Sequence, residues 1–321
     1  MNFLSLKTEA FGLDINESDL KIVKLRKKSK FFELSSFKKV TIKSGVIEAG
    51  EIKNEDALTA IIKEAQYTVD GEKLNTKYVV ASLPEEKSFL QVIQMPKMNK
   101  KELQSAIFFE AENYIPLPIG QVYLDFEVIN PAVDHLNHLD VLIVAMPRVV
   151  VDSYASCIKK AGLTPVAFEV QSEAIARALV KNQTSDSQLI LLDIGKNNVC
   201  FTVFAGCSIR FTSSISIFGK TQNDLEKFAE QVEKYLNFYQ DHSSHEHLSQ
   251  DNGVEKIILC GDGAGLNGLS DFLSKRFAIK TELGNPWINI PSKKINDAFG
   301  KKFLAFTTAL GLALRGANGE T

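Results

Sequence analysis

The sequence has 321 residues, more than one hydrophobic core usually organises, so two compact lobes are expected. Hydrophobic residues make up 45% and charged residues 24%, and the formal net charge is -2, as in an ordinary globular protein. A nucleic-acid binder would carry a strong basic excess, so the charge argues against that class.

No apolar stretch reaches the roughly 18 residues that a membrane-spanning helix needs. The apolar run 303–314 contains two threonines and is better explained as a buried helix. The first residues include Glu9, where a signal peptide would remain apolar. We therefore expect a cytoplasmic protein without a transmembrane segment. Its cysteines have no metal-ligand spacing and are expected to be reduced core thiols: Cys157, Cys200, Cys207 and Cys260.

Two segments, 12–23 and 191–202, can be aligned at a constant offset that places Asp14 on Asp193. Each contains an apolar strand ending in Leu-Asp-Ile, a polar turn and a second β-rich strand. The offset is too long for a solenoid repeat and is typical of a duplicated domain. The alignment predicts two matching hairpins, each presenting one aspartate to a shared cleft.

An aspartate at a strand end, beside exposed turn amides, can hold hydrated Mg²⁺ over phosphates. Asp14 and Asp193 are candidates for this role, and Lys21 is placed to reach back over its hairpin as a counter-charge for phosphate. The alternative is that both aspartates only cap turns, which is their commonest task. The cations that follow, from Lys24 to Lys30, are expected to form a solvated hairpin.

The chain then alternates between helix and strand up to a break at Pro84. A new block begins there, and in it Asn99 and Glu102 have the spacing of a capping box. The helix that they start should stop at 115–118, because residues before proline are pushed out of the α region. Further segments complete a small α/β insertion: strands at 88–94, 122–128 and 140–145, and a helix containing Tyr154 and Ala161.

After a strand at 165–170 and a helix at 172–180, a polar linker is expected at 182–187. The second lobe should contain one amphipathic helix, 225–239, and a strand at 256–260 that runs into glycines. A strand–glycine–helix junction lets a backbone approach a nucleotide closely. The residues expected to do so are Gly261, Asp262, Gly263 and Ala264.

One run identifies a family. Met95-Pro96-Lys97-Met98 with Glu102-Leu103 leads to Phe109-Glu110-Ala111-Glu112-Asn113-Tyr114-Ile115-Pro116 and then to Leu124-Asp125-Phe126. This run resembles the PilM family of type IV pilus assembly proteins, which are FtsA-like members of the actin-like ATPase superfamily. The resemblance covers nearly the whole chain. It implies an α/β actin-like ATPase fold, with two duplicated ribonuclease H-like lobes and a small α/β subdomain inserted in the first.

The resemblance also implies the domain limits. The first lobe would comprise 1–84, completed by 166–187 and 303–321. The inserted subdomain would be 85–165, and a shortened second lobe would be 188–302.

Function follows from the same resemblance. The protein would be a nucleotide-binding adaptor of the pilus assembly platform, peripheral on the inner membrane through its partners, and it would grip the cytoplasmic N-terminal tail of a PilN-like membrane protein. Other platform components would be further partners. ATP and Mg²⁺ are the implied cofactors, with at most slow ATP hydrolysis, in which Asp193 would position water. The implied groove for the tail contains Tyr114, Ile115, Pro116 and Pro118.

The implied metal positions are Asp14 and Asp193, through water, and the implied nucleotide contacts are Asn16, Glu17, Lys21, Gly195, Lys196, Asn197 and the segment from Gly261 to Ala264. The family's first phosphate turn is rich in glycine, whereas this chain has Asn16-Glu17-Ser18 there. This departure leaves open an actin-like scaffold that no longer binds ATP. Two other members of the superfamily are further alternatives: an FtsA-like division protein that polymerises, and a sugar kinase.

Overall fold

The structure is a computed structural model, and it describes residues 9–28, 31–129, 137–216, 222–242, 253–290 and 302–319. The chain divides into two compact units. Unit 1 contains Met1–Pro84, Asp152–Leu179 and Asn285–Thr321, and unit 2 contains Glu85–Val151 and Val180–Gly284. Packing defines these units, and the domain limits expected from the sequence remain predictions.

Unit 1 is built on a six-stranded sheet of order β11-β7-β1-β2-β3-β6. Strands β1, β2 and β3 pair antiparallel in this order, and β7 and β11 lie parallel to β1 on its other side. The bounds are β1 Phe11–Ile15, β2 Asp19–Lys28, β3 Phe31–Thr41, β6 Asp70–Gly71, β7 Tyr78–Leu83 and β11 Thr164–Val170. A separate two-stranded ribbon pairs β4 (Ile47–Glu48) with β5 (Glu51–Ile52).

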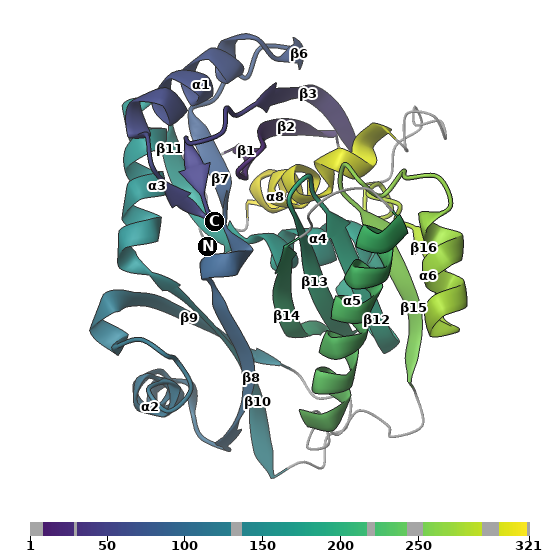
Figure 1. The fold of residues 1–321 in the computed structure, drawn as a ribbon. Coiled ribbons are helices and arrows are strands. Elements are labelled where there is room, and N and C mark those ends of the chain that lie inside the picture. Colours follow the sequence, from purple (N-terminus) through teal and green to yellow (C-terminus); the bar gives the residue numbers. More distant parts are fainter. Residues whose placement is uncertain are drawn as a thin grey trace. The chain divides into compact units, whose positions relative to one another are not determined.

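Helices cover both faces of this sheet. Figure 1 shows α4 (Gln171–Leu179) and α8 (Thr307–Asn318) on one side, and α1 (Glu55–Tyr67) and α3 (Arg148–Lys160) on the other. Helix α8 approaches β1 closely at Gly12, because a Cβ there would meet the backbone of α8 at Ala309 and Ala313. This contact fixes α8 against the strand that leads to Asp14.

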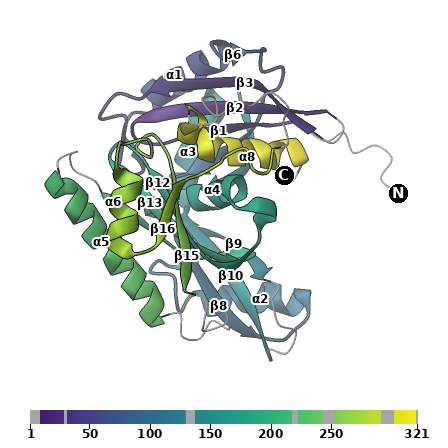
Figure 2. The same cartoon turned by 90° about the vertical axis from the view of Figure 1, so that its right-hand side faces the viewer.

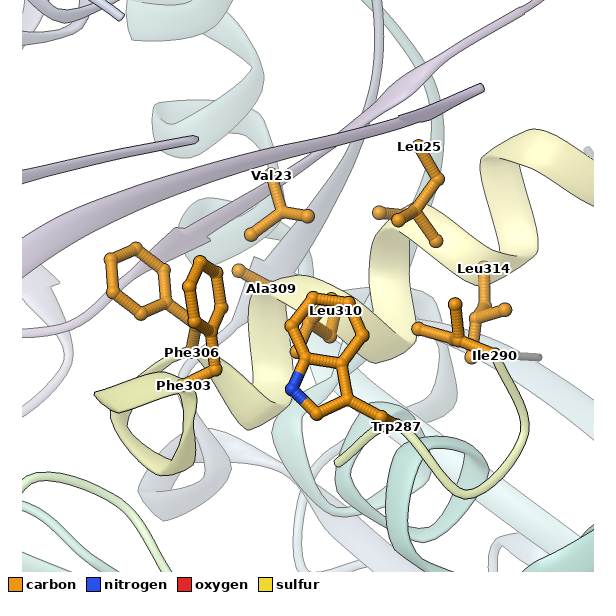
Figure 3. Close-up of a cluster of buried hydrophobic side chains, with 10 residues drawn as sticks. Val23, Leu25, Trp287, Ile290, Phe303, Phe306, Ala309, Leu310 and Leu314 are labelled. Atoms are coloured by element: carbon orange, nitrogen blue, oxygen red, sulfur yellow. The ribbon is translucent and has the colours of Figure 1, made fainter. Parts of the chain in front are cut away.

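Aromatic side chains fill the space between α8 and the sheet. Trp287 and Phe303 meet edge to face with ring centroids 5.0 Å apart, and Phe303 lies 5.1 Å from Phe37 of β3. The apolar face of β2 contributes Val23 and Leu25 to the same cluster (Figure 3). Burying this much aromatic and aliphatic surface makes the cluster a main source of stability for unit 1.

Unit 2 repeats the strand order. Its five-stranded sheet runs β14-β13-β12-β15-β16, again with three antiparallel strands and two that lie parallel to the first of the three. Helices α5 (Gln222–His242) and α6 (Leu269–Phe277) pack beside each other on it (Figure 2). The strands are β12 Ser185–Ile194, β13 Asn198–Gly206, β14 Ser208–Ser216, β15 Val254–Cys260 and β16 Lys280–Leu283.

The predicted duplication is confirmed in detail by the register of the two hairpins. Asp14 pairs across its hairpin with Lys21, and Asp193 pairs with Cys200 at the aligned positions. The turns also close alike, since the Asn16 N–H donates to the carbonyl of Asp19 at 3.0 Å and the Gly195 N–H donates to that of Asn198 at 2.9 Å.

The rest of unit 2 is a three-stranded sheet of order β8-β10-β9, with one helix packed on it. The predicted capping box is present at the start of this helix: the Asn99 side chain accepts from the Glu102 N–H, and the Glu102 carboxylate accepts from the Asn99 N–H. The helix ends before Pro116, as expected. The bounds are β8 Phe89–Pro96, α2 Lys100–Ala111, β9 Val122–Ile129 and β10 His138–Pro147.

Three expectations were wrong. Cys207 is exposed, because it lies at the tight turn between β13 and β14, where the chain reverses at the surface. The polar linker is shorter than expected, since β12 already begins at Ser185. Lys24 is buried in β2, where its ammonium lies 3.8 Å from Glu9, so it does not belong to a solvated hairpin; Lys30 lies outside the described residues.

Candidate functional site

The first hairpin turn is closed by its own side chain. The amide oxygen of Asn16 accepts hydrogen bonds from the backbone N–H groups of Ser18 and Asp19, both at 2.9 Å. Its amide nitrogen donates to the Asp19 carboxylate at 3.2 Å. The sequence predicts that the amides of this turn bind phosphate. In the structure the side-chain oxygen of Asn16 accepts their hydrogen bonds in place of a phosphate oxygen.

A row of polar side chains crosses the sheet of unit 1 beside this turn. Lys39, Lys21 and Asp14 are neighbours in register on β3, β2 and β1. The next strand, β7, contributes Ser82, whose hydroxyl donates to Asp14 at 3.0 Å and accepts from the backbone N–H of Ile15 at 2.9 Å. The sheet therefore brings together side chains from four strands at one level.

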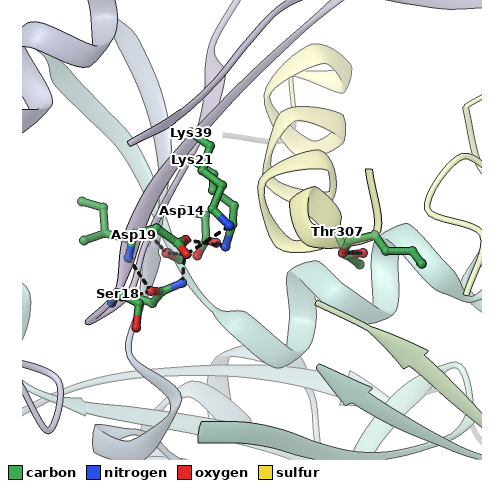
Figure 4. A network of polar contacts seen from close by, with 10 residues as sticks. Asp14, Ser18, Asp19, Lys21, Lys39 and Thr307 are labelled. Carbon is green, nitrogen blue, oxygen red and sulfur yellow. Dashed lines mark hydrogen bonds and ion pairs between the residues drawn. The ribbon is translucent and has the colours of Figure 1, made fainter. Parts of the chain in front are cut away.

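Asp19 joins this row from the start of β2. Its carboxylate lies 2.6 Å from the Lys21 ammonium and 3.4 Å from that of Lys39, and Lys21 also lies 3.6 Å from Asp14 (Figure 4). Asp14, Asp19 and Lys21 are all buried. The result is a chain of alternating charges, two carboxylates and two ammonium groups, which is buried in unit 1 except at Lys39, whose side chain is 36% exposed.

The two carboxylates differ in acidity. Burial raises the pKa of Asp14, and the neighbouring charge of Asp19 adds to this, while Lys21 and the hydrogen bond from Ser82 oppose it. Burial also disfavours ionised Asp19, but Lys21, Lys39 and the Asn16 amide outweigh that effect and hold the pKa of Asp19 below its usual value. Asp19 is thus the firmly ionised member of the pair, and a raised pKa makes Asp14 the weaker ligand for a cation.

In unit 2 the structure brings the second aspartate and the glycine segment together. Gly261 lies directly against the Asp193 carboxylate and the backbone of Ile194, and the Gly263 N–H donates to the Ile194 carbonyl at 2.8 Å. A Cβ on either glycine would collide with this strand end, and Gly261 has a φ of +86°. The close packing of this segment on β12 is therefore sufficient to explain why positions 261 and 263 are glycine.

The remaining predicted residues of this half surround the same strand end. Lys196 and Asn197 are exposed at the tip of the hairpin. Ala264 is buried, and its N–H donates to the Gly261 carbonyl at 3.4 Å. Asp262 is exposed within the glycine segment. Their roles toward a nucleotide, and the role of Asp193 in positioning water, remain predictions.

Several polar residues near these positions are not found by sequence reasoning. Asp19 is the clearest, and its signal is its spacing, because residues two apart on a strand share a face and Asp19 stands two before Lys21. Lys39 and Ser82 could not be placed, since only the register brings them to Asp14.

A second buried ionic cluster of unit 1 was also missed. Glu169, in register with Ser82, is held by both terminal nitrogens of Arg177 at 2.5 Å and by Arg315 at 3.0 Å.

The predicted partner groove lies in the small sheet domain of unit 2. Tyr114, Pro116 and Pro118 are exposed, whereas Ile115 is buried with the core residues of this domain. The Ile115 side chain therefore packs inward and is not itself a surface contact. Nearby, Arg148 stacks on the ring of Tyr123 at 4.2 Å and donates to the Gly120 carbonyl at 3.0 Å, which holds the segment after Pro118 in place.

The described residues lack two features. Within the six described ranges, no group of three or more histidine, cysteine, aspartate or glutamate side chains is arranged to hold a metal ion. No helix in the described part of the chain is long and apolar enough to cross a membrane.

Comparison with known proteins gives consistent matches. The sequence model of the family described as "Type IV pilus assembly protein PilM" matches residues 12–225 and 222–317. Among solved structures, a chain of the "PilM-PilN type IV pilus biogenesis complex" superposes with a TM-score of 0.81 at 25% identity, covering 97% of this chain and 99% of that one.

A second solved structure is the cytoplasmic domain of EpsL, an inner-membrane component of the type II secretion system of Vibrio cholerae. It superposes with a TM-score of 0.51 at 11% identity, over 96% of this chain and 95% of that one, and shows similarity of fold alone. With the duplicated sheets, these matches confirm the predicted actin-like α/β fold class.

Proposed function

The chain belongs to the family of type IV pilus assembly protein PilM, and from this membership we propose that it is an adaptor that binds the cytoplasmic tail of a PilN-like membrane protein. The observation that carries the proposal is the superposition of almost the whole chain on a chain of the PilM–PilN complex. An FtsA-like division protein is not favoured by these matches.

The small sheet domain of unit 2 supplies surface for such a partner. Monomeric proteins seldom expose large apolar side chains together without a use for them. This domain exposes Phe109 at 77% and, after the helix, Tyr114 at 38% and Leu117 at 39%. We place the tail against the segment from Tyr114 to Pro118, with Ile115 supporting it from beneath.

Binding of the tail would hold the protein at the inner face of the inner membrane. On this proposal the attachment is peripheral and depends on the partner. Other components of the platform would be reached through the same assembly.

A nucleotide is the second element of the proposal. The residues of unit 2 offer a turn without carboxylates, Gly195-Lys196-Asn197, next to Asp193 and the glycine segment, and this set fits an anionic ligand. The first hairpin fits poorly, because its turn amides and Lys21 are already bound by internal oxygens. Mg·ATP, when bound, would supply phosphate groups that the Gly195–Asn197 turn would bind.

Peptide binding tests the adaptor proposal. A fluorescein-labelled synthetic peptide with the N-terminal cytoplasmic sequence of the organism's PilN-like protein is titrated with the full chain and followed by anisotropy. We expect a Kd in the micromolar range, about 10 μM or tighter. The variants Tyr114→Ala and Leu117→Ala should weaken binding by about tenfold or more, because each removes an apolar contact.

Leu283→Ala is the matched control, since Leu283 is a leucine of nearly equal exposure, 37%, on β16. It should leave the Kd unchanged. No binding by the folded wild-type chain would overturn the adaptor proposal, and equal losses in all three variants would place the tail elsewhere.

A further inference from the structure

Two lysines lie side by side at the first hairpin, Lys21 on its strand β2 and Lys39 on the neighbouring strand β3. Lys21 and Lys39 are in direct register, and Lys21 is buried. Like charges directly opposite each other on a sheet are destabilising. An anion between the two ammonium groups relieves this repulsion, and a phosphate would serve as well as a carboxylate.

Asp19 is that anion. One carboxylate oxygen faces Lys21 at 2.6 Å and the other faces Lys39 at 3.4 Å, so a single group bridges both ammonium groups. A bridging oxyanion with two oxygens toward two cations is also how a phosphate would be held. The hairpin thus has its anion site filled from within.

The turn amides are satisfied in the same way. The Asn16 side-chain oxygen accepts from the N–H groups of Ser18 and Asp19, which are the donors that a cradled phosphate oxygen would use. Lysine ammonium groups and backbone amides are both common phosphate donors in proteins. In this hairpin both kinds are bound by oxygens of the same short segment.

The second hairpin has the opposite character. At the positions that align with Asn16-Glu17-Ser18-Asp19 it has Gly195-Lys196-Asn197-Asn198. The second turn therefore lacks both carboxylates of the first and has one lysine that the first does not have. The two copies of one hairpin have therefore diverged in charge at their tips.

We propose that Asp19, assisted by Asn16, is a resident anion that closes the first hairpin to phosphate, so that a nucleotide is held through the turn of unit 2. This inference rests on the nucleotide element of the proposed function. On this proposal the side chains of Asp19 and Asn16 occupy the anion site of the first hairpin at all times. The conformation of this hairpin then does not depend on ATP.

The test removes the resident charge. Asp19→Asn keeps the shape of the side chain but leaves Lys21 and Lys39 without their shared carboxylate. Calorimetric titration with Mg·ATP, and separately with inorganic pyrophosphate, should show binding about tenfold tighter or more than in the wild-type chain. Asp70→Asn is the matched control, because it makes the same substitution at an exposed aspartate on β6 of the same sheet, outside the ionic network, and it should change affinity by less than about threefold.

Folding is followed in parallel, since Asp19→Asn removes a buried partner. If the variant is too unstable to titrate, its thermal unfolding is measured with and without pyrophosphate. The proposal expects pyrophosphate to raise the Tm of the variant by more than it raises that of the wild type.

The outcomes separate this inference from the nucleotide proposal. If the wild-type chain binds Mg·ATP and Asp19→Asn weakens that binding, the resident-anion inference is overturned and nucleotide binding stands. If only Asp19→Asn binds phosphate, the inference stands and nucleotide binding by the native chain does not. Equal gains in Asp19→Asn and Asp70→Asn, or no gain in either, would also overturn the inference.

Discussion

Cys200 stands in the second hairpin where Lys21 stands in the first. Each lies across its hairpin from the aligned aspartate, so Asp14 faces an ammonium and Asp193 faces a thiol. Burial is the main reason that the pKa of Cys200 is raised well above its usual value, and the charge of Glu85 adds to the effect. The thiol therefore adds no charge to its hairpin, whereas the Lys21 ammonium in the other adds one positive charge that both Asp14 and Asp19 contact.

This difference predicts unequal costs of substitution. Lys21→Met leaves the buried carboxylates of Asp14 and Asp19 without their nearest cation, and we expect a loss of about 3–5 kcal/mol in the free energy of unfolding. Cys200→Ala, at the equivalent position, removes only a small apolar group and should cost about 1 kcal/mol. Urea denaturation of both variants measures this, and a loss in Lys21→Met no larger than in Cys200→Ala would contradict the ionic network described for the first hairpin.

Glu173 makes stability depend on pH. Burial, together with the nearby charge of Glu169, raises the pKa of Glu173 from 4.5 to about 8, despite Arg177 and Arg315. The folded chain therefore holds a proton that the unfolded chain releases above about pH 4.5, so this residue makes stability fall as the pH rises from 4.5 to about 8.

Glu173→Gln removes that dependence. Its Tm should match that of the wild type near pH 5 and exceed it at pH 8. The corresponding difference in the free energy of unfolding at pH 8 should be on the order of a few kcal/mol. Glu64→Gln, exposed on α1, serves as the control. If the Tm changes between pH 5 and pH 8 by the same amount in the wild type, in Glu173→Gln and in Glu64→Gln, Glu173 is not responsible for the pH dependence.

Two arginine–glutamate pairs with similar forked geometry differ in burial. Arg177 holds Glu169, whose side chain is 0% exposed, while Arg276 holds Glu233 at the surface with 42% of that side chain exposed. Arg177→Met should cost about 3 kcal/mol, because it removes two hydrogen bonds to a buried carboxylate that keeps Arg315. Arg276→Met should leave the free energy of unfolding nearly unchanged, since water replaces the lost partner. Chemical denaturation gives both values, and equal costs would contradict the burial of Glu169.

The glycine segment offers a third matched pair. Gly261→Ala places a Cβ against Asp193 and Ile194 at a positive φ of 86°, whereas an added Cβ at Gly265 meets no atom within 4 Å. We expect Gly261→Ala to lower the free energy of unfolding by roughly 1–3 kcal/mol and Gly265→Ala to change it by less than about 1 kcal/mol. If Gly261→Ala is as stable as wild type, the close packing of this segment on β12 is wrong.

The hairpins and the capping box could be predicted because their signals are local. Leu-Asp-Ile before a polar turn predicts a strand end, and Asn99 with Glu102 predicts a helix start. Register is not local, and for that reason Lys39 and Ser82 could not be joined to Asp14. Hydropathy also misplaces single residues: Cys207 follows an apolar strand and yet lies at the turn, and Lys24 is a lysine inside the sheet.

The groove residues show the same limit. Tyr114 and Ile115 are adjacent in the motif, and nothing in the motif tells which of them faces outward. The end of α2 decides this, because the N–H of Ile115 still donates to the carbonyl of Ala111 and its side chain turns into the core.

The packing of α8 on β1 has a consequence for synthesis of the protein. Gly12 leaves the ribosome well before the backbone that covers it, at Ala309 and Ala313. At about 5–20 residues per second, the strand bearing Asp14 waits many seconds for its cover. Until then the packing of α8 on β1 cannot form, so unit 1 completes its core only after this helix has been made.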